Sequence, residues 1–318
     1  MFISQKKLGY LKGQISTTML APIRLSSPGP VFSRLVAGVM TWGVWGHKLD
    51  IKEMSALIDH CLSLGITTFD HADIYGHYTT EEAFGNALTL HPKRRQEMQL
   101  VSKCGIRLVC DERPENLVKS YDLSKNYIIA SAERSLRNLR TDYLDLLLIH
   151  RPSPLMQADE VAEAIAHLKA TEKVRHFGVS NFTPSQVEYL RQATPLVTNQ
   201  VEASLLHTAP FFDGTFDQCL QHRMHPMAWS PLGDFFNRDD ETASRVADQL
   251  DEIGQKYGNP GADVILLAWL LHHPAGILPV LGTARQSRMT AAVQALDIQL
   301  SDQDWFTLIE AARGHEVA

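Results

Sequence analysis

Four titratable side chains of different chemical kinds lie at or just after the ends of short apolar segments: Asp70, Tyr75, Lys103 and His150. A tyrosine phenol has a reference pKa of about 10, so it is a poor acid near neutral pH unless a neighbour assists it. A Lys103 ammonium beside it would favour the phenolate, and a buried Asp70 would keep that ammonium charged. The three groups would form a tuned general acid, and His150 would orient a carbonyl oxygen. The set predicts a site that protonates the oxyanion formed when hydride reaches a carbonyl carbon.

The hydride has to come from outside the polypeptide, because no side chain provides it. We therefore expect a nicotinamide cofactor beside these four groups. The first predicted strand lacks the G-x-G-x-x-G motif of dinucleotide-binding folds, so the cofactor must be held in another way.

Short apolar segments alternate with longer amphipathic ones from Leu35 onward, as expected for βα units around a parallel sheet. We expect eight strands, near residues 35–40, 67–69, 99–102, 144–149, 176–179, 196–198, 226–228 and 277–281. Apolar spacing predicts helices that include 51–62 and 132–139, and further helices are expected over 244–257, 262–271 and 302–312. Thr183 and Pro184 fit a helix N-cap and the first helical position. Eight such pairs in about 285 residues match a (β/α)8 TIM barrel, whereas an open doubly wound sheet usually has fewer strands.

The N-terminal region has a different composition. Residues 1–20 are expected to form a mobile extension, with Met19 as an alternative start, ahead of a single barrel domain over 21–318. Residues 23–25 and 31–33 flank the turn cluster SSPGP at 26–30, which predicts a small β-hairpin.

Composition argues against several other classes of protein. The 318 residues carry a net charge of −6 without a basic block, which argues against nucleic-acid binding as the main task. No apolar run reaches about 18 residues, and Lys12 interrupts the apolar residues near the N-terminus, so we expect neither a membrane span nor a signal peptide. Four scattered cysteines argue against a disulfide framework. We predict a cytoplasmic protein, and nothing in the sequence requires more than a monomer.

In a barrel the active site lies at the carboxyl ends of the strands, so the residues that follow each apolar run should converge. Besides the four titratable groups, these are Thr41, Trp42, Ser180, Asn181, Gln200, Trp229, Ser230, Gly282 and Thr283. Trp42 and Trp45 follow the first strand and are predicted to form walls of a substrate pocket. Arg151 is interpreted as a loop cation rather than a substrate clamp.

Six separated motifs occur in one order, each at a predicted strand end. They are FDHADIYG at 69–76, VSK at 101–103, LLIH at 147–150, GVSNF at 178–182, NQVE at 199–202 and WSPLG at 229–233. With these motifs the chain resembles the aldo-keto reductase superfamily, in register from about residue 35 to 312. The resemblance implies a (β/α)8 barrel whose bottom is closed by a short hairpin.

The resemblance also implies roles for individual residues. Asp70, Tyr75, Lys103 and His150 would be the catalytic tetrad, with Tyr75 as the general acid. Thr41 is an expected cofactor contact. Ser180, Asn181 and Gln200 would bind the nicotinamide carboxamide, and Trp229 would stack on the nicotinamide ring. Ser230, Leu232, Gly282 and Thr283 would contact the pyrophosphate, and Arg288 would contact the 2′-phosphate. Arg288, assisted by Arg285, would favour NADPH over NADH, because a guanidinium matches a phosphate.

The chain departs from the family pattern at two places. Ala291 and Ala292 stand where many members have Glu-Asn, so two adenine contacts are missing. His71 replaces a commoner Thr beside Asp70, and the sequence assigns it no role.

Two other functions remain to be weighed. His71, Asp73 and His77 with Asp70 could belong to a metal-dependent hydrolase, but residues on one strand cannot all point inward, and we predict no metal. Some family members bind NADP and serve as regulatory or sensor subunits, and an intact tetrad does not exclude that role.

We expect an enzyme that acts on a small carbonyl substrate, whose identity the sequence does not specify. The short tail after the last helix predicts an open pocket.

Overall fold

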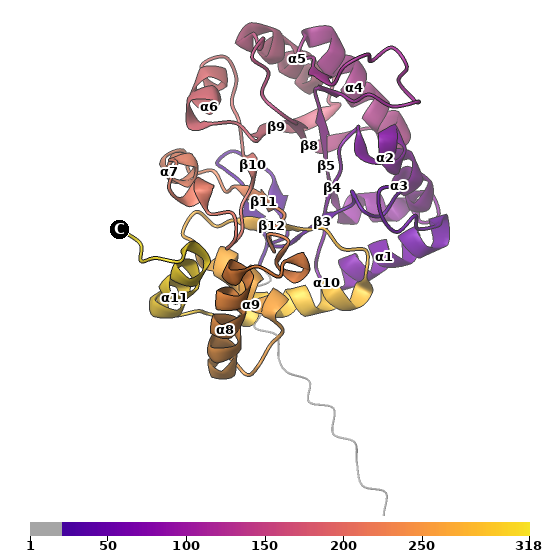
Figure 1. Cartoon of the computed structure of the whole chain (residues 1–318). Coiled ribbons are helices and arrows are strands. Elements are labelled where there is room, and N and C mark those ends of the chain that lie inside the picture. Colours follow the sequence, from indigo (N-terminus) through magenta and orange to yellow (C-terminus); the bar gives the residue numbers. More distant parts are fainter. Residues whose placement is uncertain (1–20) are drawn as a thin grey trace, which may run out of the picture.

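Eight parallel strands form a closed barrel in the computed structural model, which describes residues 21–318 (Figure 1). The barrel strands are β3 (Val36–Gly38), β4 (Thr68–Asp70), β5 (Gln99–Cys104), β8 (Leu144–Ile149), β9 (Val174–Ser180), β10 (Asn199–Glu202), β11 (Met227–Trp229) and β12 (Leu278–Leu281). Each strand pairs with its neighbours in chain order, and β12 closes the ring by pairing with β3. The predicted (β/α)8 TIM barrel is confirmed.

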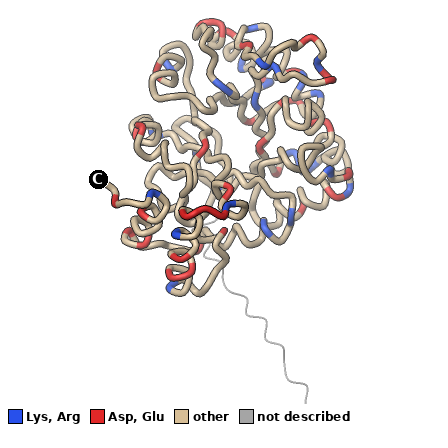
Figure 2. Tube along the Cα trace, in the orientation of Figure 1, with Lys and Arg blue, Asp and Glu red and all other residues tan. Residues whose placement is uncertain are grey.

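Helices surround the ring of strands, which Figure 1 shows nearly end on. They are α1 (Ile51–Ser63), α2 (Tyr75–Tyr78), α3 (Thr80–Leu88), α4 (Lys125–Asn138), α5 (Ala158–Ala170), α6 (Pro184–Arg191), α7 (Thr215–Gln221), α8 (Glu241–Lys256), α9 (Ala262–His272), α10 (Gln286–Val293) and α11 (Asp302–Arg313). The predicted cap of α6 is confirmed, because the Thr183 side chain accepts a hydrogen bond from the Gln186 backbone N–H in a capping box. Lys and Arg are interspersed with Asp and Glu along the chain (Figure 2).

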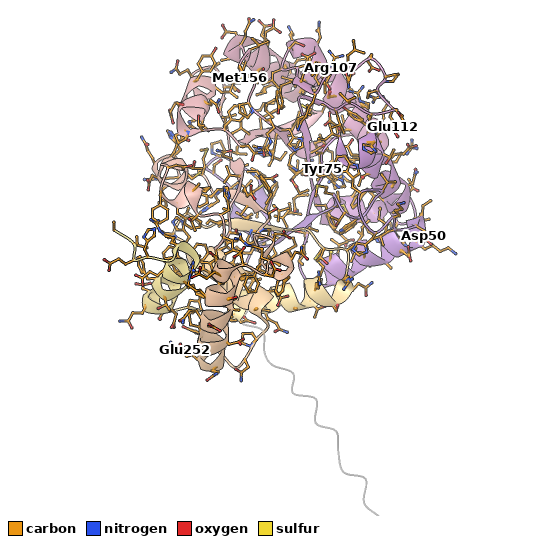
Figure 3. The ribbon with its side chains drawn as sticks, viewed as in Figure 1. Asp50, Tyr75, Arg107, Glu112, Met156 and Glu252 are labelled. Carbon is orange, nitrogen blue, oxygen red and sulfur yellow. The ribbon has the colours of Figure 1, made fainter. Side chains whose placement is uncertain are left out.

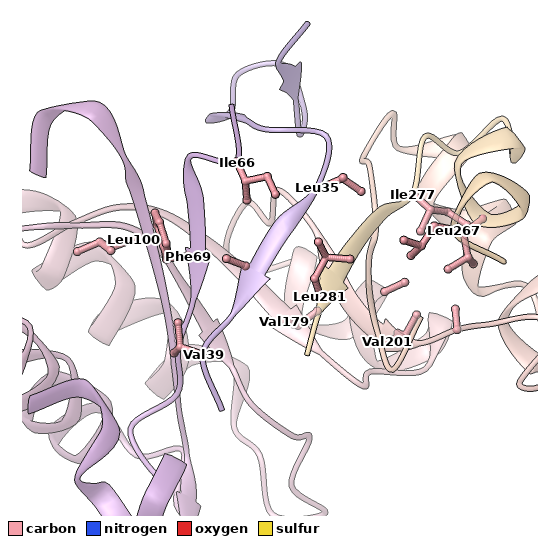
Figure 4. Packing of buried hydrophobic residues seen from close by; sticks show 14 of the residues in the cluster. Leu35, Val39, Ile66, Phe69, Leu100, Val179, Val201, Leu267, Ile277 and Leu281 are labelled. Carbon is pink, nitrogen blue, oxygen red and sulfur yellow. The ribbon is translucent and has the colours of Figure 1, made fainter. Parts of the chain in front are cut away.

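The core has two layers because each strand is covered on both sides. Outward-facing strand side chains such as Phe69 and Leu100 pack between the barrel and the helices, together with helix side chains such as Leu267 of α9 (Figure 4). Inward-facing ones such as Val101 and Leu146 fill the barrel. This double burial explains why the strands are recognisable as nearly continuous apolar runs.

The predicted hairpin is also present and closes the bottom of the barrel. Strands β1 (Ile23–Arg24) and β2 (Val31–Phe32) pair antiparallel, and Leu25 and Phe32 are fully buried among the inward-facing strand residues. The hairpin is fixed to the amino ends of the strands: the Leu25 carbonyl accepts from the His225 N–H at 2.8 Å, and the Ser33 hydroxyl accepts from the Thr68 N–H at 3.1 Å. The opposite end of the barrel therefore stays open for a site. The prediction for residues 1–20 lies outside the described residues.

One strand prediction is wrong in position. The sixth barrel strand begins at Asn199, after the apolar residues 196–198 that were expected to form it. Asn199 and Gln200 are polar but buried within this strand, so a search for apolar runs does not detect them. A second hairpin, β6 (Ile106–Arg107) with β7 (Ser120–Tyr121), extends beyond β5 and was not predicted.

Candidate active site

Several site residues come from the last positions of the strands, whereas Tyr75, His150 and Asn181 follow the strands. Asp70 ends β4, Lys103 is the penultimate residue of β5, and Ser180 and Trp229 end β9 and β11. His150 directly follows β8, and its backbone N–H donates to the Cys104 carbonyl at 2.8 Å. Rigid, paired backbone therefore holds these side chains. Tyr75 lies among the strands near the middle of the molecule (Figure 3).

The Lys103 ammonium joins the predicted tetrad. Its Nζ donates to Asp70 Oδ2 at 2.7 Å, to the His71 carbonyl at 2.9 Å and to the Tyr75 hydroxyl at 3.0 Å. An ammonium has three donors, so all of them are used. The Lys103 residue is only 1% exposed. A fully satisfied, buried cation thus lies directly against the phenol.

Tyr75 reaches this position through a tight turn after β4. The next two residues, Gly76 and His77, have left-handed backbone conformations with φ of 57° and 55°. A Cβ atom at position 76 would approach the Thr80 hydroxyl oxygen to 2.4 Å, so only glycine fits there. The turn therefore depends on the Tyr-Gly pair in the motif at 69–76.

The pKa of Tyr75 differs from the expectation that Lys103 would favour the phenolate. Burial raises the pKa of Tyr75, and the opposing effect of Lys103 does not overcome it. Burial also acts against the Lys103 ammonium, but Asp70 and Tyr75 outweigh it and raise the pKa of Lys103. In this state the phenol keeps its proton and the ammonium its charge. The pair is set to donate a proton rather than to accept one.

His150 lies across from Tyr75, with ring centroids 6.0 Å apart and the planes nearly perpendicular. Burial lowers the pKa of His150 well below its usual value, and the neighbouring cations Lys103, Arg151 and Lys119 lower it further. The imidazole is therefore neutral near pH 7. A neutral imidazole carries one N–H, which can donate to a ligand oxygen.

Asn181 connects β9 with β8 and β11. Its Nδ2 donates to the Ser180 hydroxyl at 2.8 Å and to the His150 carbonyl at 3.3 Å, and its Oδ1 accepts from Trp229 Nε1 at 2.9 Å. Asn181 has φ of 61°, a left-handed conformation that asparagine tolerates better than most residues. The network therefore fixes the position of the Trp229 ring relative to β8 and β9.

Gln200 has a contact that the sequence did not indicate. Its Nε2 donates to Asp70 Oδ1 at 3.0 Å, so the Asp70 carboxylate is held by Lys103 on one oxygen and by Gln200 on the other. Gln200 thereby orients the carboxylate of the tetrad. Its expected contact with a nicotinamide carboxamide stays a prediction.

Two adjoining cavities open at this end of the barrel. One, the tetrad cavity, has a volume of about 460 Å³ and is lined by three of the four tetrad residues, Asp70, Tyr75 and His150. Thr41, Ser180, Asn181, Gln200 and Trp229 also line it. The other, of about 490 Å³, is lined by Leu232, Thr283 and Arg288 among others. Ser230, Pro231 and Gly282 line both. Together they make an elongated groove that leads away from the tetrad.

The second cavity has the donor set that a dinucleotide would need. A Cβ atom at Gly282 would meet nothing within 4 Å, so a ligand can approach the backbone there. Helix α10 begins three residues beyond Thr283, and a helix N-terminus favours anions. Arg288 lines the cavity and forms no ion pair within residues 21–318. Arg285 is the N-cap residue of α10 and does not line the cavity.

The prediction that Trp42 forms a pocket wall is wrong. Trp42 is fully buried, and its ring packs against Phe69 and Phe84 with centroids 6.2 Å away in each case. Its Nε1 donates to the carbonyl of Thr283 at 3.0 Å, so it anchors a residue that lines the second cavity. Trp45 does line the tetrad cavity, 6.2 Å from the Tyr75 ring.

His71 belongs to the core rather than to a ligand set. Its ring is fully buried and lies edge-on to Phe84 with centroids 4.4 Å apart, and burial lowers the pKa of His71 to about 3. Among the described residues, no group of three or more His, Cys, Asp or Glu side chains is placed to hold a metal ion. No helix in residues 21–318 has the length and apolar character needed to cross a membrane.

Sequence reasoning missed several lining residues of the tetrad cavity. Met40, Ile74, Ile106, Lys119 and Arg151 all contribute to it. Ile106 and Lys119 come from the unpredicted β6–β7 hairpin and its connection. Arg151 was interpreted as a loop cation, and its position next to His150 was the available signal.

A barrel with a buried ammonium, a phenol and a neutral imidazole at the carboxyl ends of its strands has the architecture of an enzyme. Residues 34–313 match the family model described as the aldo/keto reductase family, and the chain belongs to that family of oxidoreductases.

Named relatives agree with this assignment. An uncharacterized oxidoreductase of Bacillus subtilis is 45% identical over 290 residues, covering 90% of this chain and 96% of its own length. A 6-dehydroglucose reductase of Agrobacterium fabrum is 42% identical over 285 residues, covering 88% of this chain and 95% of its own. The crystal structure of an aldo-keto reductase from Klebsiella pneumoniae in complex with NADPH superposes with a TM-score of 0.72 at 26% identity, covering 91% of this chain and 93% of that one.

Proposed function

We propose that this protein is an NADPH-dependent reductase that converts an aldehyde or ketone to an alcohol, with Tyr75 as the general acid. The observation that carries the proposal is the position of Lys103 Nζ, 2.7 Å from Asp70 and 3.0 Å from the Tyr75 hydroxyl. Bound NADPH would supply the hydride to the carbonyl carbon. The protein has to supply the proton and hold the carbonyl oxygen.

The carbonyl oxygen would bind between Tyr75 and His150. The neutral imidazole of His150 donates one hydrogen bond to it, and the Tyr75 hydroxyl donates the other. As negative charge develops on that oxygen, the proton of Tyr75 moves to it. The Lys103 ammonium stabilises the phenolate that remains, and Asp70 keeps that ammonium in place. A proton from solvent then restores the phenol.

The preference for NADPH is also part of the proposal. Arg288 lines the second cavity but not the one that contains Tyr75 and His150, and it has no described carboxylate partner. A guanidinium without a partner gains more from a 2′-phosphate than from a 2′-hydroxyl. The NADPH complex of the Klebsiella pneumoniae relative supports the same cofactor.

Steady-state NADPH oxidation with a panel of aldehydes tests the proposal, together with a fluorescence titration of NADPH. The panel includes aromatic, aliphatic and polyhydroxylated aldehydes, because one relative is named a 6-dehydroglucose reductase. We expect turnover with several members. Stoichiometric NADPH binding without turnover above the buffer rate for any of them would instead support a regulatory or sensor subunit.

A further inference from the structure

Two cations without carboxylate partners line the tetrad cavity, and the proposed reaction uses neither. Arg151 follows His150 at the end of β8, and Lys119 directly precedes β7. Lys119 is exposed and Arg151 is half-buried. In residues 21–318 no Asp or Glu forms an ion pair with either of them, although fourteen other pairs are present. Two elements far apart in the sequence therefore present unpaired positive charge to one cavity.

The rest of the cavity does not balance this charge. Among the residues that the structure describes, Asp70 is the only carboxylate in the lining, and its charge is paired with Lys103 at 2.7 Å. His150 is kept neutral, chiefly by burial and Lys103, and both Arg151 and Lys119 contribute to lowering its pKa. The positive charge of both cations thus reaches the place where the carbonyl oxygen would bind. With Asp70 paired to Lys103, the two cations leave the lining with a net positive charge.

A neutral polyhydroxylated ligand would leave the charges of Arg151 and Lys119 unbalanced. Hydroxyl groups need acceptors as well as donors, whereas Lys and Arg side chains only donate. The acceptor oxygens of Asp70 and Asn181 in the lining already accept hydrogen bonds from Gln200, Lys103 and Trp229. Beside the apolar side chains of Trp45, Ile74 and Ile106, the wall also carries neutral hydroxyl and amide groups, those of Thr41, Ser180, Gln200 and Ser230, and none of these carries a charge that would balance the two cations.

We propose that Arg151 and Lys119 form a subsite for an anionic substituent, a carboxylate or a phosphate, on the carbonyl substrate. The subsite rests on the proposed function, because it places the anion on the same molecule whose carbonyl oxygen binds between Tyr75 and His150. The planar guanidinium of Arg151 matches either group with two parallel hydrogen bonds, and the Lys119 ammonium adds a second charge. The guanidinium carbon of Arg151 lies 5.7 Å from the centroid of the Trp229 ring, which limits its range of positions.

Two matched pairs of substrates test the subsite. The carboxylate pair is 4-formylbenzoate and its methyl ester, and the phosphate pair is glyceraldehyde 3-phosphate and glyceraldehyde. For the wild-type protein with saturating NADPH, kcat/KM for one or both charged members should exceed that of the neutral partner by about 10- to 100-fold. The pair with the larger ratio identifies the kind of anion. The ratio should fall as salt is raised from low to high ionic strength, because the cations are near solvent.

Substitutions of Arg151 and Lys119 test whether these two residues cause the preference for charged substrates. Arg151→Gln and Lys119→Gln should each lower the ratio of charged to neutral kcat/KM by at least about fivefold, and the double variant should bring it near one. Lys93→Gln is the matched control, because Lys93 is an exposed cation that does not line the tetrad cavity. It should leave the ratio as in the wild type.

The outcomes separate this subsite from the proposed function. Turnover of the neutral aldehydes with no preference for a charged partner in either pair would overturn the subsite and leave the reductase intact. A kcat/KM for glyceraldehyde above that of both charged substrates would also overturn it, since the cations would then serve hydroxyl groups. NADPH binding without turnover of any of the four compounds would overturn the reductase, and the subsite with it.

Discussion

Replacement of Lys103 by methionine separates the structural role of the buried ion pair from its chemical role. The change removes three hydrogen bonds and leaves the Asp70 carboxylate buried with Gln200 as its remaining side-chain partner. Loss of one partner from a buried ion pair costs about 3 to 5 kcal/mol of unfolding free energy. We expect Lys103→Met to lose that amount, and to lose about 10²- to 10⁴-fold in kcat for carbonyl reduction because the general acid is no longer assisted.

The double variant Asp70→Asn, Lys103→Met makes the prediction sharper. It removes the unpaired charge, so we expect it to recover about 2 kcal/mol or more of the lost stability. It still lacks the ammonium, so its turnover should stay as low as that of the single variant. Urea denaturation followed by tryptophan fluorescence, without cofactor, measures the first quantity, and NADPH oxidation measures the second. Lys93→Met controls for loss of an exposed lysine.

The pH dependence of the pair has a defined sign. The pKa of Lys103 is raised in the folded protein, so the stability that it contributes is fully present below the unfolded value of about 10.4 and is lost only as the pH rises through the folded value. Titration of Lys103 should therefore contribute nothing to the stability difference between wild type and Lys103→Met from about pH 6 to 8, and the difference should shrink as the pH falls only because the unpaired Asp70 of the variant takes up a proton. Equal stability of the single and double variants, or recovered turnover in the double variant, would refute this reasoning.

Two further predictions concern His71 and Arg288. Burial lowers the pKa of His71 to about 3, so its contribution to stability is present above the unfolded value and is lost as the pH falls through the range between them. Compared with His71→Leu, the wild type should lose about 2 kcal/mol of unfolding free energy between pH 7 and about pH 5, measured by urea denaturation at each pH; parallel curves would contradict this. Arg288→Ala should weaken NADPH binding by about 10- to 100-fold and NADH binding by less than about twofold, measured by fluorescence titration; equal losses would exclude the phosphate contact.

The barrel could be predicted from the sequence because strands covered on both faces leave a strong apolar signal. That signal also has a physical limit. Gln200 is a buried strand residue whose polar side chain binds Asp70. The predicted strand, placed on residues 196–198, therefore ended before the first residue of the real strand, Asn199. The tetrad was predictable from motifs at strand ends, whose positions the barrel fixes.

Side chains on loops were harder to predict because their direction depends on the loop conformation. Trp42 and Trp45 are three residues apart after β3, yet one turns into the core and the other faces the cavity. Lys119 reaches the same cavity from the end of a long excursion whose short hairpin carries no clear apolar run. The sequence also could not show whether the pKa of Tyr75 is raised or lowered, because burial raises it, Lys103 lowers it, and the depth of burial decides the result.

The most direct test of the account is the turnover of Tyr75→Phe. The variant removes only the hydroxyl, and Lys103 keeps its bonds to Asp70 and the His71 carbonyl. Tyr189→Phe is the matched control, because the Tyr189 hydroxyl accepts from the Ala158 N–H at 3.3 Å, away from the cavity. We predict that Tyr75→Phe loses at least about 10²-fold in kcat for carbonyl reduction while NADPH affinity changes by less than about threefold. A Tyr75→Phe protein that keeps most of its turnover would show that the proton comes from another group.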